Sequence, residues 1–392
     1  MIGLALDTLL TAVFIGLADF MNRNIRDYTS DRWMRPRETG PTSTRPSLTV
    51  IVPARNEEAN IEACIEGLMA QEYQGLTVRV VNDASTDRTG EILDRLVCKF
   101  PRLTVVTPPA KPDGWAGKAH ACHQGALGVE TDWLMFVDAD TRTQPQLARI
   151  AVADAESLHL DLLSTVPHQE IGSIGEALTV PMIFWVLFTL LPLRQVWESP
   201  DPRFAAACGQ FLLVRRAAYE AAGGHAHRPD SLHDGLHLAR RFKVCGLKVG
   251  LCDLSDWIAC RMYRGFGESW TGFSRNAYQA LESPAVLILV TGIEFVLFLF
   301  PYLQFAVGLA MGWVEPLLFG AIQSAMLLTI ASSLRRRFRL PRFWVMAHPI
   351  SVALLIAIQW NSAIRCWLRL PTRWKARAIP LPGGSRSEAR QR

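Results

Sequence analysis

The chain has 392 residues, of which 49% are hydrophobic and 20% are charged, and its formal net charge is +5. This composition is too apolar for an ordinary soluble protein and too charged for a purely transmembrane one, so it indicates a soluble domain joined to membrane segments. The basic residues lie beside apolar runs and in the tail, without the interleaved aromatic residues of nucleic-acid grooves. We therefore expect the lipid bilayer as a partner and no nucleic acid.

The eight cysteines are scattered and include no C-x-x-C pair. This spacing favours neither a zinc ribbon nor a disulfide framework, and it fits a reducing cytosol.

The first apolar segment covers residues 2–19, close to the ~18 to 20 residues that span a bilayer as a helix. We predict a transmembrane anchor at residues 1–20. Five arginines follow it: Arg23, Arg26, Arg32, Arg35 and Arg37. A cleaved signal peptide carries its positive charge before the apolar run, so an uncleaved anchor is the better interpretation. By the positive-inside rule, the domain that follows lies in the cytoplasm.

Residues 45–275 are predicted to form one α/β domain. Short runs rich in apolar and β-branched residues, typical of strands, occur at 48–54, 76–83, 103–108 and 133–139. Between the first two, residues 56–71 place Ile61, Ile65 and Leu68 at helical spacing. The alternation of strand and helix favours a mostly parallel sheet covered by helices.

A C-terminal membrane region is predicted at residues 284–362, with apolar segments at 284–311, 316–334 and 343–360. The last two flank the basic sequence RRRFRLPR (335–342), which marks a cytoplasmic loop. Three crossings from a cytoplasmic domain would leave the basic tail, residues 363–392, outside. Either one segment is re-entrant or interfacial, or the first, which Pro301 interrupts, makes two short passes. The sequence leaves this topology open.

Another apolar segment, residues 178–196, lies inside the α/β domain. Pro181 and Pro192 limit it to about ten uninterrupted residues, which is too short to span a bilayer. An interfacial helix beside the active site and a buried core helix are the two interpretations.

Polar and acidic residues follow the predicted strands. Glu57 comes after the first strand, Asp83 ends the second, and Asp138 and Asp140 end the fourth. Because ligands of such sheets bind at the carboxyl ends of the strands, we expect these side chains to meet at one edge. Two carboxylates one residue apart repel each other, and a divalent cation that prefers oxygen, Mg²⁺ or Mn²⁺, removes the repulsion. The alternative is an ordinary acidic turn, since turns favour Asp.

The segment GWAGKAHACHQGA (114–126) lies between the third and fourth predicted strands. Its glycines and Lys118 suggest a loop in which a cation approaches phosphate, although its spacing is not that of a Walker A loop. A surface lysine in a flexible loop is the alternative.

Four histidines occur within a short span: His225, His227, His233 and His237. The last two are at i, i+4, a spacing that can bind zinc on a helix face. Without nearby cysteines or an H-E-x-x-H order, cleft or surface histidines are the preferred interpretation.

Four motifs together resemble those of the family 2 glycosyltransferases with a GT-A fold. They are PARNEE (53–58), VNDASTD (81–87), GWAGKA (114–119) and FVDADT (136–141), in this order. Most similar are the membrane-anchored bacterial members associated with hopanoid and carotenoid glycosylation. The similarity continues through residues 207–225, 231–249 and 261–276, so it covers most of the soluble part.

The resemblance implies a Rossmann-like GT-A domain that binds a nucleotide sugar, such as a UDP- or GDP-sugar. The residues implied to hold its nucleotide are Pro53, Arg55, Glu57 and Asp83, with Lys118 near the base or diphosphate. Asp138 and Asp140 would form a D-x-D pair whose divalent cation bridges the two phosphates, so that Asp138 also serves donor binding.

Asp234 matches the later aspartate of the family, the general base that deprotonates an acceptor hydroxyl. Many members have a second acidic residue just before it, where this chain has His233. The Q-x-x-R-W motif of the processive members is missing, and residues 269–276 occupy the comparable place, which favours single transfer. Trp270 and Arg275 in this segment either contact donor or acceptor, or anchor the chain at the membrane interface.

We therefore predict an inverting glycosyltransferase of the bacterial inner (plasma) membrane, with its catalytic domain in the cytoplasm. It would move a sugar from a nucleotide sugar to a hydroxyl of a membrane lipid, an isoprenoid such as a hopanoid or carotenoid. The alternatives are a processive polysaccharide synthase and a non-catalytic membrane scaffold with the same fold.

Overall fold

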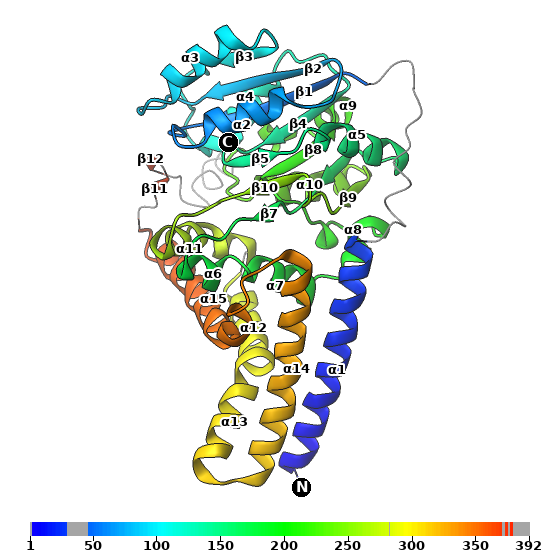
Figure 1. The fold of residues 1–392 in the computed structure, drawn as a ribbon, viewed down its shortest axis with the longest axis vertical. Helices are drawn as coiled ribbons and strands as arrows, with labels where there is room; N and C mark the ends of the chain where they lie inside the picture. The colour runs from blue at the N-terminus through cyan, green and yellow to red at the C-terminus, as the bar shows by residue number, and fades with distance from the viewer. Residues whose placement is uncertain (1, 30–45, 282, 371–372, 375–376, 379–392) are drawn as a thin grey trace, which may run out of the picture. The chain divides into compact units, whose positions relative to one another are not determined.

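The computed structural model describes residues 2–29, 46–281, 283–370, 373–374 and 377–378. The chain divides into a helical unit and an α/β unit (Figure 1). Residues 1–26, 171–192 and 262–370 make up the helical unit, and residues 27–170, 193–261 and 371–392 make up the α/β unit. Arg32, Arg35 and Arg37 of the predicted basic flank lie outside the described residues, as does most of the basic tail.

A seven-stranded sheet is the centre of the α/β unit, in the order β3-β2-β1-β4-β8-β6-β9. Its strands are β1 (Leu48–Ala54), β2 (Leu76–Asn82), β3 (Leu103–Val106), β4 (Trp133–Val137), β6 (Leu162–Ser164), β8 (Phe211–Arg215) and β9 (Val249–Leu251). Only β8 runs against its neighbours, β4 and β6, while the other neighbouring strands in this sheet are parallel. The predicted mostly parallel sheet is therefore confirmed, and the four predicted strands are β1 to β4.

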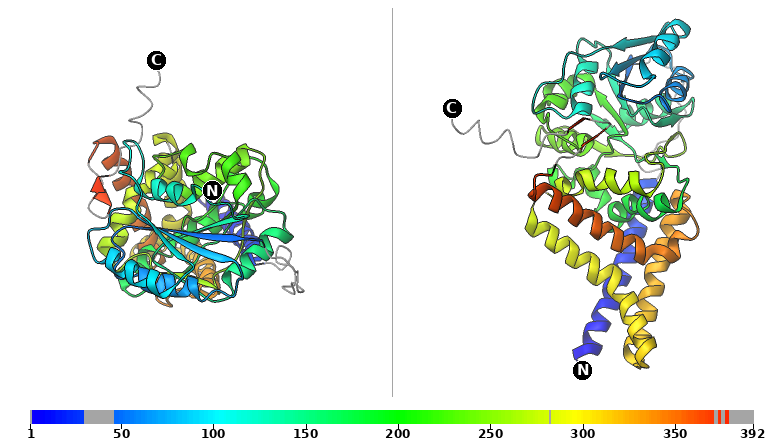
Figure 2. Two further views of the ribbon diagram at one scale, coloured as in Figure 1. Left: turned by 90° about the horizontal axis from the view of Figure 1, so that it is seen from above. Right: turned by 90° about the vertical axis from the view of Figure 1, so that its left-hand side faces the viewer.

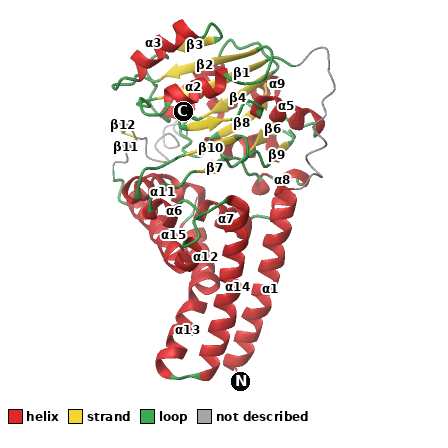
Figure 3. Cartoon of the chain, viewed as in Figure 1, coloured by secondary structure: helices red, strands yellow, loops and turns green. Residues whose placement is uncertain are grey.

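Helices cover both faces of this sheet (Figures 2 and 3). One face packs against α2 (Ile61–Met69), α3 (Thr89–Lys99) and α5 (Leu147–Ser157), and the other against α4 (Gly117–Ala126), α9 (Arg216–Ala221) and α10 (Asp234–Val244). Alternation along β1 explains the two cores, because Val50 and Val52 join the first and Ile51 joins the second. A sheet buried on both faces needs such continuous apolar strands.

Shorter elements complete the α/β unit. A second sheet has the order β5-β10-β7, formed by β5 (Thr141–Thr143), β10 (Ile258–Cys260) and β7 (His168–Gln169). The remaining described elements are α8 (Leu193–Glu198), η1 (Pro202–Phe204), η2 (Gly224–His227), β11 (Arg373–Trp374) and β12 (Arg377–Ala378).

Two local predictions are wrong. Residues 56–60 are not helical, and Asn56 has a positive φ of 52°. Residues 117–126 are not a loop but the helix α4, with Lys118 in its first turn. Gly125 serves close packing there, since a Cβ at this position would lie 2.5 Å from the Ile51 side chain on β1. Gly125, one of the glycines that suggested a flexible loop, thus lets the helix approach the sheet.

In the part of the chain that the structure describes, four helices are long and apolar enough to cross a membrane: Gly3–Thr29, Pro284–Met311, Val314–Phe338 and Trp344–Trp367. The first belongs to α1 (Ile2–Thr29), which is longer than the predicted anchor because the polar residues after position 20 continue the helix. The second is built from α12 (Pro284–Glu294), the π-helical turn η3 (Phe295–Leu299) and α13 (Phe300–Met311), so Pro301 does not divide it into two passes. The others are α14 (Val314–Phe338) and α15 (Trp344–Trp367).

The apolar segment predicted at 178–196 contributes mainly to the helical unit. It contains part of α6 (Ile174–Thr179), all of α7 (Met182–Leu190) and the start of α8. The helix α11 (Phe266–Leu281), which carries Trp270 and Arg275, belongs to the same unit, and α15 packs against both α6 and α11.

Candidate active site

The carboxyl end of β4 carries the D-x-D pair on a tight turn. The Asp138 carbonyl accepts hydrogen bonds from the amide and the hydroxyl of Thr141, at 3.1 and 2.8 Å. The Asp138 amide donates to the carbonyl of Gln210 at 3.2 Å, which ties the turn to the segment before β8. The backbone of Asp138 is thus fixed from both sides.

Lys118 joins residues that are far apart in the chain. Its Nζ lies 2.8 Å from Oδ1 of Asp138 and 3.1 Å from Oδ2 of Asp234, and it donates to the Gly209 carbonyl at 2.9 Å. The side chains of Lys118, Asp138 and Asp234 retain 25%, 23% and 10% of their surface exposed. The structure therefore brings three of the predicted site residues into direct contact in a mostly buried place.

The charges in this cluster shift one another's pKa values. Burial raises the pKa of Asp138, and although Lys118 opposes this, Asp140 and Asp234 add to it, so the pKa lies well above its ordinary value. Burial acts in the same direction on Asp234, but there the Lys118 ammonium prevails and lowers the pKa. Burial would lower the pKa of Lys118, yet the two carboxylates raise it well above its ordinary value. Asp234 is accordingly held as a carboxylate. With Asp138 and Asp140 nearby, the cluster has more acidic than basic groups.

Two glycines permit this close approach. A Cβ at Gly209 would overlap Oδ1 of Asp234 and lie 3.0 Å from Nζ of Lys118. A Cβ at Gly235, the second residue of α10, would lie 2.7 Å from the amide nitrogen of Gly209. Only residues without side chains let the segment before β8 touch the start of α10, where Asp234 also faces the positive end of the helix dipole.

Asp140 lies on the other side of the D-x-D turn. The thiol of Cys260 on β10 shares a hydrogen bond with its side chain, and burial, Asp140 and Asp138 together raise the pKa of that thiol well above its ordinary value. Burial also raises the pKa of Cys64 on α2, and both Asp140 and Glu57 contribute to the increase. Glu57 and Asp140, predicted from different strand ends, therefore both act on Cys64.

The predicted nucleotide residues at the ends of β1 and β2 form a second set. Arg55 is buried, and its Nη1 donates to the carbonyls of Asp83 and Ala84 at 2.6 and 2.8 Å. Asp83 is also buried, at 4% exposed, and half-buried Pro53 stands opposite Val81 in the register of the two strands. Arg55 thus fixes the loop after β2.

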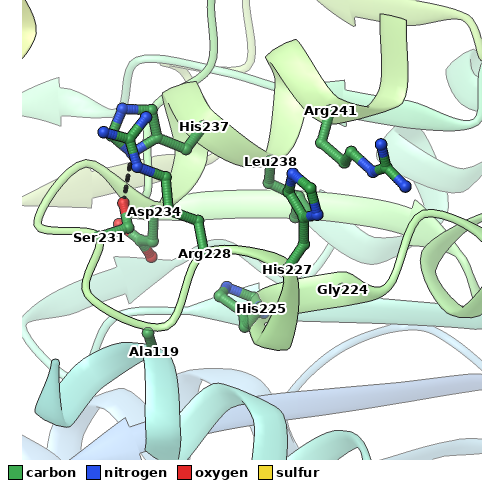
Figure 4. A pocket seen from close by; sticks show the side chains of 10 residues that line it. All are labelled: Ala119, Gly224, His225, His227, Arg228, Ser231, Asp234, His237, Leu238 and Arg241. Carbon is green, nitrogen blue, oxygen red and sulfur yellow. Dashed lines mark hydrogen bonds between the residues drawn. The ribbon is translucent and has the colours of Figure 1, made fainter. Parts of the chain in front are cut away.

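The four histidines take different places. His225 is buried, His237 accepts or donates a 2.6 Å hydrogen bond with the Ser231 hydroxyl, and the rings of His233 and His237 are 6.5 Å apart. Three of them line a pocket formed by α4, η2, the segment after η2 and α10: Ala119, Gly224, His225, His227, Arg228, Ser231, Asp234, His237, Leu238 and Arg241 (Figure 4). Only His225 of the four has a cysteine and a carboxylate close by, among the described residues.

Several residues at this site were not singled out from the sequence. Gly209, Gln210 and Gly235 hold the segments together, and Cys260 contacts Asp140. Gly209 and Gln210 belong to the segment ACGQF, which contributed to the family resemblance without a role of its own. Their spacing carries no chemical signal, because their function depends on which segment lies opposite.

The D-x-D carboxylates fit a hard divalent cation. In this half-buried turn the negative charges of Asp140 and Asp234 raise the pKa of Asp138 further, beyond the effect of burial. Oxygen ligands with excess negative charge are what Mg²⁺ and Mn²⁺ prefer.

Part of the chain matches a family of known proteins. Residues 49–222 match the family model described as glycosyl transferase family 2. The matched residues contain β1 to β4, the D-x-D turn and Lys118, whereas Asp234 follows them.

Two curated relatives of the glycosyltransferase domain bear the same name, 4,4'-diaponeurosporenoate glycosyltransferase. The protein from Staphylococcus aureus (strain MRSA252) is 31% identical over 233 residues, 57% of this chain and 60% of the relative. That from Staphylococcus haemolyticus (strain JCSC1435) is 26% identical over 252 residues, 63% of this chain and 66% of the relative. The alignments thus span just under two thirds of these relatives.

A solved structure shows the same fold. The mannosyltransferase PcManGT from Pyrobaculum calidifontis, determined with GDP-Man and Mn²⁺, is similar with a TM-score of 0.54 and 21% identity. The similarity covers 92% of this chain and 97% of that one. The predicted GT-A fold with membrane helices at both ends is therefore confirmed.

Proposed function

We propose that this chain is an inverting glycosyltransferase that moves one sugar from a nucleotide sugar to a membrane lipid, an isoprenoid such as a hopanoid or carotenoid. One observation carries the proposal: Lys118 bridges Asp138 after β4 and Asp234 at the start of α10. A donor-side carboxylate and a candidate base are thereby held on opposite sides of one ammonium group.

We assign the binding of the nucleotide-sugar donor to residues at the carboxyl ends of the strands. Pro53, Arg55, Glu57 and Asp83 would hold the nucleotide, because Arg55 orders the loop after β2 and Asp83 is buried at its base. Lys118 is positively charged and would contact the diphosphate of a UDP- or GDP-sugar. When the donor binds, the Lys118 ammonium would move from the two carboxylates to the diphosphate.

Asp138 and Asp140 would hold a divalent cation, Mg²⁺ or Mn²⁺, which supplies positive charge against the leaving diphosphate when bound. PcManGT, the fold relative, was solved with Mn²⁺ and a GDP-sugar, which supports this assignment. We expect the chain itself to contribute the fixed turn that orients both carboxylates, through Thr141 and Gln210.

Asp234 would accept the proton of an acceptor hydroxyl as its oxygen attacks the anomeric carbon. The lowered pKa keeps this carboxylate ionised at neutral pH, the state that a general base needs. Direct attack by the acceptor needs no covalent sugar intermediate and inverts the anomeric centre.

Whether the reaction depends on Asp234 as a base is determined by the acceptor group, which is either a hydroxyl or a carboxylate. The compound named for the staphylococcal relatives is a carboxylate, which has no proton to lose at neutral pH, whereas a hydroxyl must be deprotonated. If the acceptor is a hydroxyl, Asp234→Asn abolishes transfer. If it is a carboxylate, the same variant retains most of its activity.

The test combines membranes of cells that make the chain with UDP- and GDP-sugars and either Mg²⁺ or Mn²⁺. Mass spectrometry of the extracted lipids should show one added hexose mass on one lipid class, in the wild type and not in Asp140→Asn. A ladder of added sugars would instead indicate a polysaccharide synthase. Absence of nucleotide-sugar binding in calorimetry, with the chain folded, would indicate a scaffold.

We also propose a topology at the bacterial inner membrane with the catalytic domain in the cytoplasm. Within the helical unit, α1, α13 and α14 run side by side, and the chain's beginning lies at the same end as the α13–α14 turn (Figure 1). The α15 helix instead packs against α6 and α11, which are too short to span. We therefore assign α15 to the membrane interface, which leaves three crossings.

This assignment removes the difficulty that three C-terminal crossings create. The basic turn at residues 335–342 and the basic tail then both lie in the cytoplasm, as the positive-inside rule requires. A fluorescent reporter that matures only in the cytoplasm, fused after Arg392, should be bright. Activity of a fused periplasmic phosphatase at the same position would contradict the assignment and restore four crossings.

A further inference from the structure

Beside the proposed active site lies a group of three metal-ligand side chains that the transfer reaction does not use as a set. Cys122 on α4, His225 on η2 and Asp234 on α10 each present one ligand atom, and these atoms lie within 4.8 Å of one another. Cys122 and His225 are 1% and 4% exposed. Sulfur, imidazole nitrogen and carboxylate oxygen together are ligands typical of Zn²⁺ rather than of Mg²⁺.

The surroundings of His225 are those of a histidine prepared for a metal. Its Nδ1 lies 2.8 Å from the Tyr219 hydroxyl, and the Phe136 ring packs against it edge-on, 4.8 Å between centroids. In the described residues its other nitrogen, Nε2, is buried and has no hydrogen-bond partner. A metal-bound histidine usually has its second nitrogen held in this way, which fixes the orientation of the ring.

We propose that Cys122, His225 and Asp234 bind a zinc-class divalent cation, at a site separate from Asp138 and Asp140. Three protein ligands leave one position of a tetrahedral ion open, and small inward shifts bring the three atoms to bonding distance. Binding replaces the thiol proton of Cys122, which passes to solvent. One proton is therefore released for each ion that binds.

Occupation of this site has a consequence that depends on the proposed function. Because Asp234 is shared, the zinc-class ion withdraws the base from the acceptor and competes with Lys118 for the same carboxylate. Zn²⁺ then inhibits sugar transfer even when Mg²⁺ saturates the D-x-D pair.

The site itself is tested without any activity measurement, on the purified full chain in detergent. Titration with Co²⁺ should produce one equivalent of the thiolate-to-metal charge-transfer absorption, which Zn²⁺ then displaces. Cys122→Ser should abolish this absorption. His225→Gln should weaken binding by at least about 100-fold, and Tyr219→Phe by about 10 to 100-fold, since loss of an outer partner alone has an effect of that size.

Matched controls separate this site from others. Cys98→Ser and Cys245→Ser remove exposed thiols, and Asp140→Asn disrupts the D-x-D pair, so all three should retain the absorption. The proposal is overturned if the absorption does not appear, if it survives in Cys122→Ser, or if it is lost with an exposed cysteine instead. Should Cys122→Ser fail to fold, as judged by its melting temperature, His225→Gln decides the question by the same criteria.

The regulatory part is tested separately, by measuring lipid glycosylation against Zn²⁺ concentration at saturating Mg²⁺. The inhibition constant should rise at least about 10-fold in Tyr219→Phe. An unchanged inhibition constant would overturn the regulatory part. Complete absence of transfer by the wild type would overturn the proposed function and leave the Co²⁺ result unaffected.

Discussion

Buried polar groups are arranged differently in the two units. In the helical unit they form pairs across helix interfaces: Gln304 on α13 donates to Asp7 on α1 at 2.8 Å, and Gln359 on α15 donates to Glu294 on α12 at 2.8 Å. In the α/β unit, Lys118, Asp138 and Asp234 instead converge on one point, with Asp140 adding further charge.

The buried polar groups of the helical unit thus connect helices, whereas those of the α/β unit bring charges together. A hydrogen bond between two helices gives a partner to polar groups that lipid cannot hydrogen-bond. The measured contribution of such bonds to stability is modest. A cluster with excess negative charge lowers the stability of the fold, which agrees with the raised pKa of Asp138. Such clusters occur mostly at functional sites, where a ligand or cation binds to them. Substitutions in the two units should therefore affect different quantities.

The largest effect is expected from Asp234→Asn. Loss of the proposed general base should reduce turnover by about 10² to 10⁴-fold for a hydroxyl acceptor, with little loss of stability because the amide keeps the shape of the carboxylate. Lipid glycosylation in membranes measures the change. Asp94→Asn, at an exposed position on α3, is the matched control and should retain wild-type activity.

Lys118→Met should lower stability as well as activity. It leaves two mostly buried carboxylates without their shared cation, at a cost of about 2 to 3 kcal/mol in the free energy of unfolding. The double variant with Asp138→Asn should recover part of this loss, because it removes one of the uncompensated charges. Additive losses in the thermal melts would show that Lys118 and Asp138 are not coupled.

Gly209→Ala should disturb the site by packing alone. Its Cβ would overlap Asp234, and relief of that overlap costs about 1 to 3 kcal/mol and displaces the carboxylate. Gly90→Ala on α3 is the control, because its added Cβ meets the Asn82 side chain at an ordinary 3.6 Å. Equal activity and melting temperature for both variants would contradict the close approach of the two segments.

The smallest effect is expected from Gln323→Leu in the helical unit. Gln323 on α14 donates to the Asp7 carbonyl and to the Thr11 hydroxyl, both at 3.2 Å, and interhelical bonds of this kind contribute about 0.6 kcal/mol on average. The melting temperature in detergent should fall slightly while sugar transfer is retained. Leu318→Ala, on the exposed side of the same helix, provides the comparison. Abolished transfer in a folded Gln323→Leu protein would show that the helical unit also serves the reaction.

The sequence predicted what depends on local pattern. The strands β1 to β4 and the long apolar C-terminal helices follow from periodicity and composition. The boundaries of α1 and α2 were less accurate, since polar residues continue one helix and the Asn56 loop shortens the other. The loop expected around Lys118 is a helix, and its Gly125 serves close packing against β1 instead of a turn.

By itself the sequence determined that polar residues follow apolar strands. The end of each strand can be read from the residues that come next in the chain. It also determined the D-x-D pair and the apolar lengths of the membrane helices. Tertiary structure alone decided that Lys118 binds both Asp138 and Asp234, that Gly209 faces Gly235, and that Cys122 approaches His225. Along the chain the residues of these contacts are 20 to 116 positions apart, and the contacts depend on how α4 and α10 pack on one face of the sheet, which no local pattern records.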